Sequence, residues 1–249
     1  MEEFKWELSK LIRNDHVKDL TDDKLTYFKR GFETAHRTPQ IYGMHKLHNK
    51  FTDYVPFRPV NSQVDLLSAM ASKFVDDYYL KKILQVTWTK SLEVCNRLKH
   101  VNFSQPNIWA STSDAIAMYP NINNEEGITA CEKYFTLFAK EYKHFFPSEL
   151  IVKLLWLIMT KHVFMFGNTY WIQEDGTVMC THYACNCVTI TFAYYKRTDI
   201  LPCFRINLLF YVWFIDDILL IWKDSLNSPN TFDSFKQSLD EQCKLEWTT

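Results

Sequence analysis

Two adjacent carboxylates, Asp216 and Asp217, interrupt an otherwise apolar run that extends from Ile206 to Trp222. An ionised carboxylate that is buried without a partner costs many kcal/mol, so a fold keeps such a pair only where cations, hydrogen bonds or a cleft compensate for it. Adjacent residues of a strand point to opposite faces, so we expect a tight hairpin turn that places both side chains near one cleft. A plain solvent-exposed β-turn with aspartate at its tip is the alternative interpretation.

Asp114 is the third acidic candidate, because it ends a β-leaning segment that begins at Ile108 and is followed five residues later by Tyr119. If its strand neighbours the turn at Asp216 and Asp217, three carboxylates converge. Mg²⁺ prefers carboxylate oxygens together with the phosphate oxygens of a substrate, and Mn²⁺ is a similarly hard cation. The three aspartates are therefore a predicted ligand set for two divalent cations, Mg²⁺ or Mn²⁺.

Two other polar clusters favour simpler interpretations. Asp76 and Asp77 form a second acidic pair, but apolar residues spaced three and four apart around them indicate a helix whose solvated face holds both. We interpret that pair as structural. The tightest cysteine cluster, within residues 180–187, has a C-x4-C-x-C spacing without a second pair, which is a poor zinc pattern.

Composition excludes several classes of protein. The chain has 249 residues and only five glycines. The closest two, Gly167 and Gly176, are nine positions apart, whereas G-x-G-x-x-G, P-loop and G-x-S-x-G motifs each need two glycines within about eight residues. With 28 basic and 29 acidic residues the net charge is −1, so a polyanionic partner must be met by a local patch. The hydrophobic content of 47% excludes a disordered chain.

The spacing of apolar residues predicts the elements that must position the carboxylates. The prolines and histidines at residues 38–60 predict strands and loops. The apolar run from residue 204 to 222 predicts buried strands. The whole pattern favours an α+β fold with a mainly antiparallel sheet. The other expected elements are helices at 1–37, 63–97, 125–145, 148–164, 182–196 and 232–243, and strands at 108–119, 168–172 and 245–247.

Cysteine usage and the N-terminal residues indicate an intracellular protein, with nucleus or cytoplasm left open. Seven cysteines without regular spacing give no disulfide framework, and the acidic start at Met1 lacks the layout of a signal peptide. The apolar stretches at 149–166 and 206–222 both contain charged residues, so neither supplies the ~20 uncharged residues that a membrane span needs.

The order of the motifs resembles that of reverse transcriptases. Asp114 followed five positions later by Tyr119, then Gly-Thr-Val-Met at 176–179, then Phe-Ile-Asp-Asp at 214–217, is similar to their palm motifs. Upstream, Tyr-Gly-Met-His-Lys-Leu-His at 42–48 and Arg-Pro-Val at 58–60 resemble the fingers signature of Penelope-like retroelements, as does Ala-Met-Tyr-Pro-Asn-Ile at 117–122. The resemblance covers about residues 40–249.

The resemblance implies a right-hand polymerase with fingers, palm and an antiparallel palm sheet. Residues 1–105 would form a helical lead-in and the fingers, 106–135 the palm with the first acidic motif, and 136–180 the return helices of the fingers. Residues 181–249 would form the palm with the paired aspartates, and the chain would end before the thumb.

The resemblance also implies an RNA-directed DNA polymerase of a retroelement, which acts on an RNA or DNA template with its primer and on deoxynucleoside triphosphates. In such enzymes Asp114 and Asp216 would bind the two metal ions and Asp217 would assist. Tyr119 would lie under the sugar of the incoming nucleotide. Cations at Lys46 and Arg58 would meet phosphates. Met179, Cys180 and Thr181 would contact the substrate.

Two departures from the family pattern keep other functions open. Cys180 stands where the family has glycine, and His45 stands where proline is common. Glycine lets the backbone approach a nucleotide closely, so the sulfur of Cys180 would crowd template or substrate. A non-catalytic retroelement remnant that at most binds nucleic acid is therefore one alternative. A metal-dependent phosphohydrolase that uses the same carboxylates is another.

Overall fold

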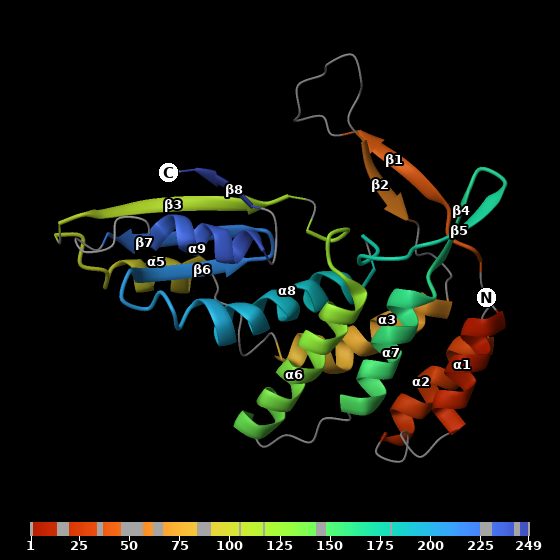
Figure 1. The fold of residues 1–249 in the computed structure, drawn as a ribbon. Coiled ribbons are helices and arrows are strands. Elements are labelled where there is room, and N and C mark those ends of the chain that lie inside the picture. Colours follow the sequence, from red (N-terminus) through yellow and green to blue (C-terminus); the bar gives the residue numbers. More distant parts are fainter. Residues whose placement is uncertain are drawn as a thin grey trace.

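The chain forms a mixed α/β structure with antiparallel sheets, as the sequence predicted (Figure 1). The computed structural model describes residues 2–13, 20–33, 37–45, 57–61, 67–83, 91–104, 106–116, 118–142, 148–179, 181–224, 231–241 and 245–248. Two predicted site residues, Lys46 and Cys180, lie outside these ranges. Among the described residues, no helix is both long and apolar enough to span a membrane.

A four-stranded sheet is built by β3 (Ile108–Ala115), β6 (Leu208–Phe214), β7 (Asp217–Lys223) and β8 (Leu245–Thr248). Its order is β6-β7-β3-β8, and all neighbours are antiparallel. The predicted apolar run thus forms a hairpin, with β7 at the centre of the sheet beside β3. In β3, Ser111, Ser113 and Ala115 are buried while the residues between them are exposed, which is the period of two that one covered face requires.

Helix α9 (Thr231–Asp240) packs its aromatic side chains against the tryptophans of the sheet. The ring of Phe232 lies 4.3 Å from Trp109 of β3, and Phe235 lies 5.1 Å from Trp222 of β7, between ring centroids. Phe235 and Trp222 are fully buried. Burial of aromatic side chains of this size contributes about 1.5–3 kcal/mol each, so α9 stabilises the sheet that carries the carboxylates.

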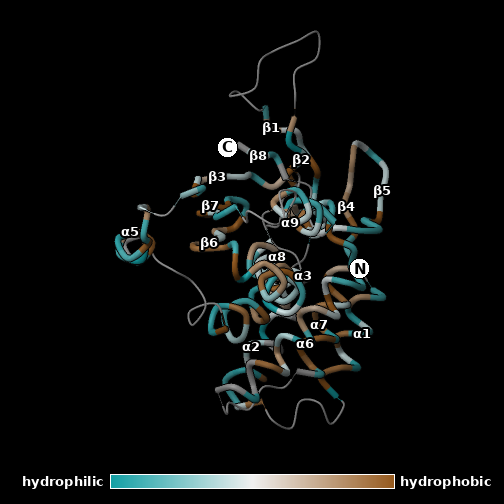
Figure 2. The backbone as a smooth tube through the Cα atoms, turned by 60° about the vertical axis from the view of Figure 1, so that its left-hand side comes forward, coloured by the Kyte–Doolittle hydropathy of each residue, from teal (hydrophilic) through white to brown (hydrophobic). Residues whose placement is uncertain are grey.

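The second half of the interior is formed by helices. The long α6 (Asn124–Tyr142) packs on α7 (Ser148–Thr160) and α8 (Ala184–Tyr195), and α3 (Leu67–Val75) packs on α7. Figure 2 shows hydrophobic residues concentrated along α7, α8 and β6. The remaining elements are α1 (Glu2–Arg13), α2 (Asp22–Glu33), the π-helical turns η2 (Asp76–Leu80) and η3 (Lys196–Ile200), and α5 (Ser91–Leu98).

Two hairpins lie next to each other near the start of α3 (Figure 1). One joins β1 (Ile41–His45) to β2 (Phe57–Asn61), and the other joins β4 (Val163–Phe166) to β5 (Thr169–Ile172). They are linked where the Met165 N–H donates to the Pro39 carbonyl oxygen at 2.7 Å.

Two expectations from the sequence are wrong. The helix expected at 148–164 ends at Thr160, and residues 163–166 are the strand β4. The aromatic and β-branched residues there pair with β5 across a turn in which Gly167 adopts φ 60°. Asp76 is the other error, because its side chain is buried at 2% exposure instead of lying on a solvated helix face.

Candidate metal centre and adjoining pocket

The structure brings Asp114, Asp216 and Asp217 together at one end of the four-stranded sheet. Asp114 lies near the end of β3 and stands opposite Asp217, the first residue of β7, in the antiparallel register. The backbone N–H of Ala115 donates to the Asp216 carbonyl oxygen at 2.9 Å. One carboxylate oxygen from each aspartate lies within 4.8 Å of the others. The adjacent pair Asp216 and Asp217 therefore shares one site with Asp114, which is about a hundred positions away in the sequence.

The turn that presents the pair is conformationally strained. Ile215 adopts φ 56°, a left-handed value that β-branched residues rarely occupy. Such a conformation costs about 1–3 kcal/mol and persists only where its surroundings impose it. The indole N–H of Trp213 donates to the Ile215 carbonyl oxygen, which holds the turn. This two-residue turn places Asp216 and Asp217 beside Asp114, and the side chains of all three aspartates are exposed.

Electrostatic repulsion acts among the three carboxylates. Burial raises the pKa of Asp217, and the neighbouring charges of Asp216 and Asp114 raise it further. Among the described residues, no lysine, arginine or histidine forms an ion pair with any of the three. Oxygen donors of this kind, close together and without a basic partner, suit a hard divalent cation such as Mg²⁺.

A cavity of about 610 Å³ adjoins the carboxylates, with Asp216 at its edge. Its walls come from the β1–β2 hairpin, the segments after β3 and before α8, and the first turn of α8. The structure places four further predicted site residues in this lining, namely Arg58, Tyr119, Met179 and Thr181. A pocket of this volume is within the range of about 300–1,000 Å³ that small-molecule ligands occupy.

Tyr119 is held at the pocket by its backbone. Its carbonyl oxygen accepts a hydrogen bond from the N–H of Thr177 at 2.8 Å, and the N–H of Gly176 donates to the Ile122 carbonyl oxygen at 2.9 Å. Gly176 adopts φ 86°, and a Cβ on it would lie 2.8 Å from the backbone of Pro120. Only glycine meets both conditions, so this residue fixes the segment that carries Tyr119.

The other predicted residues differ in exposure. Arg58 is exposed on β2, opposite Met44 of β1. Thr181 is buried, and its hydroxyl donates to the Val178 carbonyl oxygen at 2.9 Å. Met179 is half-buried.

Cys185 is among the pocket residues that the sequence did not predict. Cys185, in the first turn of α8, lines the cavity beside Asp216. Burial raises the pKa of its thiol, and a hydrogen bond with Tyr119 opposes that rise. Its spacing in the sequence pointed only to a poor zinc pattern, and it is the fold that brings Cys185 to the cavity.

Comparison with solved structures identifies polymerases of similar fold. The chain matches apo telomerase from Candida tropicalis with a TM-score of 0.50 at 10% identity, covering 90% of this chain and 53% of the telomerase chain. It matches the BmCPV RNA-dependent RNA polymerase with a TM-score of 0.50 at 10% identity, covering 98% of this chain and 25% of that one. It matches a structure described as an RdRp complex with a TM-score of 0.54 at 11% identity, covering 95% of this chain and 24% of that one.

These similarities establish a polymerase-like fold. The chain spans between about a quarter and about half the length of the three polymerase chains. No protein-family model matches the sequence, and no curated protein matches it either.

Proposed function

We propose that this chain is the RNA-directed DNA polymerase domain of a retroelement related to Penelope-like elements, and that it adds deoxynucleotides to a primer 3′-hydroxyl. The observation that carries the proposal is the convergence of three carboxylates at the edge of a nucleotide-sized cavity. The polymerase-like fold and the order of the sequence motifs support it. In this proposal the β1–β2 hairpin belongs to the fingers and the four-stranded sheet to the palm.

Asp114, Asp216 and Asp217 would hold the divalent cations. Mg²⁺ or Mn²⁺ bound there would lower the pKa of the primer hydroxyl and neutralise charge on the triphosphate. In the reaction, the 3′-oxygen bonds to the α-phosphorus while the bond from that phosphorus to pyrophosphate breaks. The hydroxyl proton passes to water and pyrophosphate leaves.

The pocket residues would bind and orient the nucleotide. Tyr119, fixed by Gly176 and Thr177, would lie under the sugar and exclude a 2′-hydroxyl. Arg58 offers a planar pair of donors to phosphate oxygens, and Lys46 would add a second cation. Met179, Cys180 and Thr181 would contact the substrate. Holding the reactants in this geometry supplies much of the rate enhancement in phosphoryl transfer.

The test is incorporation of one radiolabelled deoxynucleotide into a primer on an RNA template, with Mg²⁺ or Mn²⁺. We expect extended primer and an equal amount of pyrophosphate from the parent chain. Asp216→Asn should lower the rate by at least about a hundredfold, because it removes one charge from a site that stabilises the transition state. Asp240→Asn is the matched control, since Asp240 is an exposed carboxylate at the end of α9.

Other products would identify the alternative functions. Phosphate released without primer or template would indicate the phosphohydrolase. Template binding without incorporation, by folded protein, would indicate the non-catalytic remnant that Cys180 suggests.

A further inference from the structure

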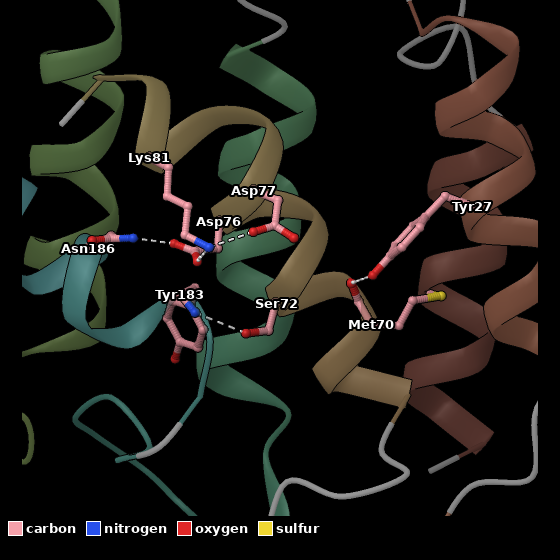
Figure 3. A network of polar contacts seen from close by, with 8 residues as sticks. All are labelled: Tyr27, Met70, Ser72, Asp76, Asp77, Lys81, Tyr183 and Asn186. Atoms are coloured by element: carbon pink, nitrogen blue, oxygen red, sulfur yellow. Dashed lines mark hydrogen bonds and ion pairs between the residues drawn. The ribbon is translucent and has the colours of Figure 1, made fainter. Parts of the chain in front are cut away.

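Asp76 is a buried carboxylate that lies between Lys81 and Asn186 (Figure 3). Its side chain is 3% exposed, yet both of its oxygens have partners. One oxygen lies 3.0 Å from the ammonium of Lys81, which reaches it from the next turn of the same helical segment. The other accepts a hydrogen bond from the side-chain amide of Asn186. A buried carboxylate is tolerated when it is paired and hydrogen-bonded in this way.

A second hydrogen bond joins the same two segments of the chain. The backbone N–H of Tyr183 donates to the hydroxyl of Ser72 at 3.1 Å, and both residues are fully buried. Ser72 lies one helical turn before Asp76, and Tyr183 lies just before α8. Together the two contacts attach the first turn of α8 to α3 and η2, segments more than a hundred positions apart (Figure 3).

The same turn of α8 forms part of the pocket wall. Ala184 and Cys185 line the cavity together with Tyr119. Successive residues of a helix are about 100° apart around its axis, at 3.6 residues per turn. Cys185 and its neighbour Asn186 therefore meet different partners, the pocket on one side and Asp76 on the other.

We propose that Asp76 is a positioning residue for the nucleotide pocket, acting through Asn186 on the wall formed by Cys185 and Tyr119. The inference rests on the proposed function, because it takes the cavity to be the site of the incoming deoxynucleotide. Supporting contacts of this kind orient the groups that touch a ligand, and their loss typically costs about 10–100-fold in affinity or activity.

Asp77 provides a matched control in the adjacent position. It pairs with the same Lys81 at 2.6 Å, but its side chain is 37% exposed and it makes no contact with α8 among those that the structure describes. Asp76→Asn and Asp77→Asn each remove one negative charge from Lys81. Only the first affects the hydrogen bond to Asn186, because an amide at position 76 has one acceptor oxygen for two donors, so its NH2 group must face either the ammonium of Lys81 or the amide N–H of Asn186.

The experiment measures binding of dATP in the presence of Ca²⁺ by calorimetry, and the KM and kcat for its incorporation with Mg²⁺. Asp76→Asn should weaken binding and raise KM by about tenfold or more while kcat changes less than about threefold. Asp77→Asn should match the parent. The exchanged pair Asp76→Asn with Asn186→Asp restores a hydrogen bond of reversed polarity and should recover most of the affinity. Should Asp76→Asn fail to fold, Asn186→Ala keeps the Asp76–Lys81 ion pair and should give the same loss.

Three results would overturn the inference. One is parent-like dATP binding by folded Asp76→Asn or Asn186→Ala, another is an equal loss in Asp77→Asn, and the third is no recovery in the exchanged pair. If the parent chain itself neither binds nor incorporates dATP, the proposed function fails and this inference fails with it. That outcome is distinguished because it occurs in the unaltered chain.

Discussion

The contribution of Asp217 to the free energy of unfolding depends on pH. Its pKa in the folded chain is raised by burial and by the charges of Asp216 and Asp114. The folded state therefore binds the proton more tightly than the unfolded state, whose aspartate pKa is about 3.9. Binding of this proton therefore adds to the free energy of unfolding. The added stability is complete at pH values below the unfolded pKa and is lost as pH rises through the raised pKa of the folded state.

The variant Asp217→Asn should not lose stability in this way as pH rises. We expect the free energy of unfolding of the variant, minus that of the parent, to increase as pH rises from about 4 through the folded pKa of Asp217. The measurement is urea denaturation at a series of pH values with a chelator present, so that no divalent cation offsets the repulsion. A difference that stays constant over this range, or that falls, would show that the repulsion does not act in the folded chain.

At the scale of elements, the segment from Tyr119 to Ile122 and the segment at 176–177 hold the pocket together. The backbone N–H groups of Gly176 and Thr177 donate to the carbonyl oxygens of Ile122 and Tyr119, and Gly176 permits the close approach of the two segments. The strained conformation of Ile215 has a comparable role for the carboxylates. Neighbouring elements impose the positive φ of Ile215, as they impose that of Gly176.

Gly176→Ala should separate the two segments. Its Cβ would meet Pro120 at 2.8 Å and the Tyr119 carbonyl oxygen at 3.0 Å, so we expect a loss of about 2–4 kcal/mol from overpacking and backbone strain together. Gly167→Ala is the control, because Gly167 also has positive φ, at 60°, but a Cβ there would meet nothing within 4 Å. That variant should lose only about 1 kcal/mol. Chemical denaturation measures both, and equal losses would refute the close approach.

Most elements were predictable because their patterns are local. The hairpin of β6 and β7 follows from paired charges inside an apolar run. Strand β4 was missed because its apolar residues continue the apolar pattern of α7. The burial of Asp76 could not be predicted, since its partner Asn186 is 110 positions away and helical periodicity does not report long-range hydrogen bonds.

At the scale of the whole molecule, one fold joins two distant sets of residues. The sheet supplies the carboxylates, and the helices with the β1–β2 hairpin supply the pocket beside them. The telomerase and RNA-dependent RNA polymerase structures compared above have a similar fold at 10–11% identity. Among the described residues the arrangement provides both a candidate metal centre and a space for a nucleotide.

Template dependence tests the central claim most directly. The measurement is primer extension by the purified chain on four RNA templates that differ only in the first unpaired base, with all four deoxynucleotides and Mg²⁺ or Mn²⁺. We predict that the nucleotide added follows the template base by Watson–Crick pairing, and that Asp216→Asn adds none. Addition that ignores the template base, or no addition by parent protein shown to be folded, would contradict the assignment of this chain as an RNA-directed DNA polymerase.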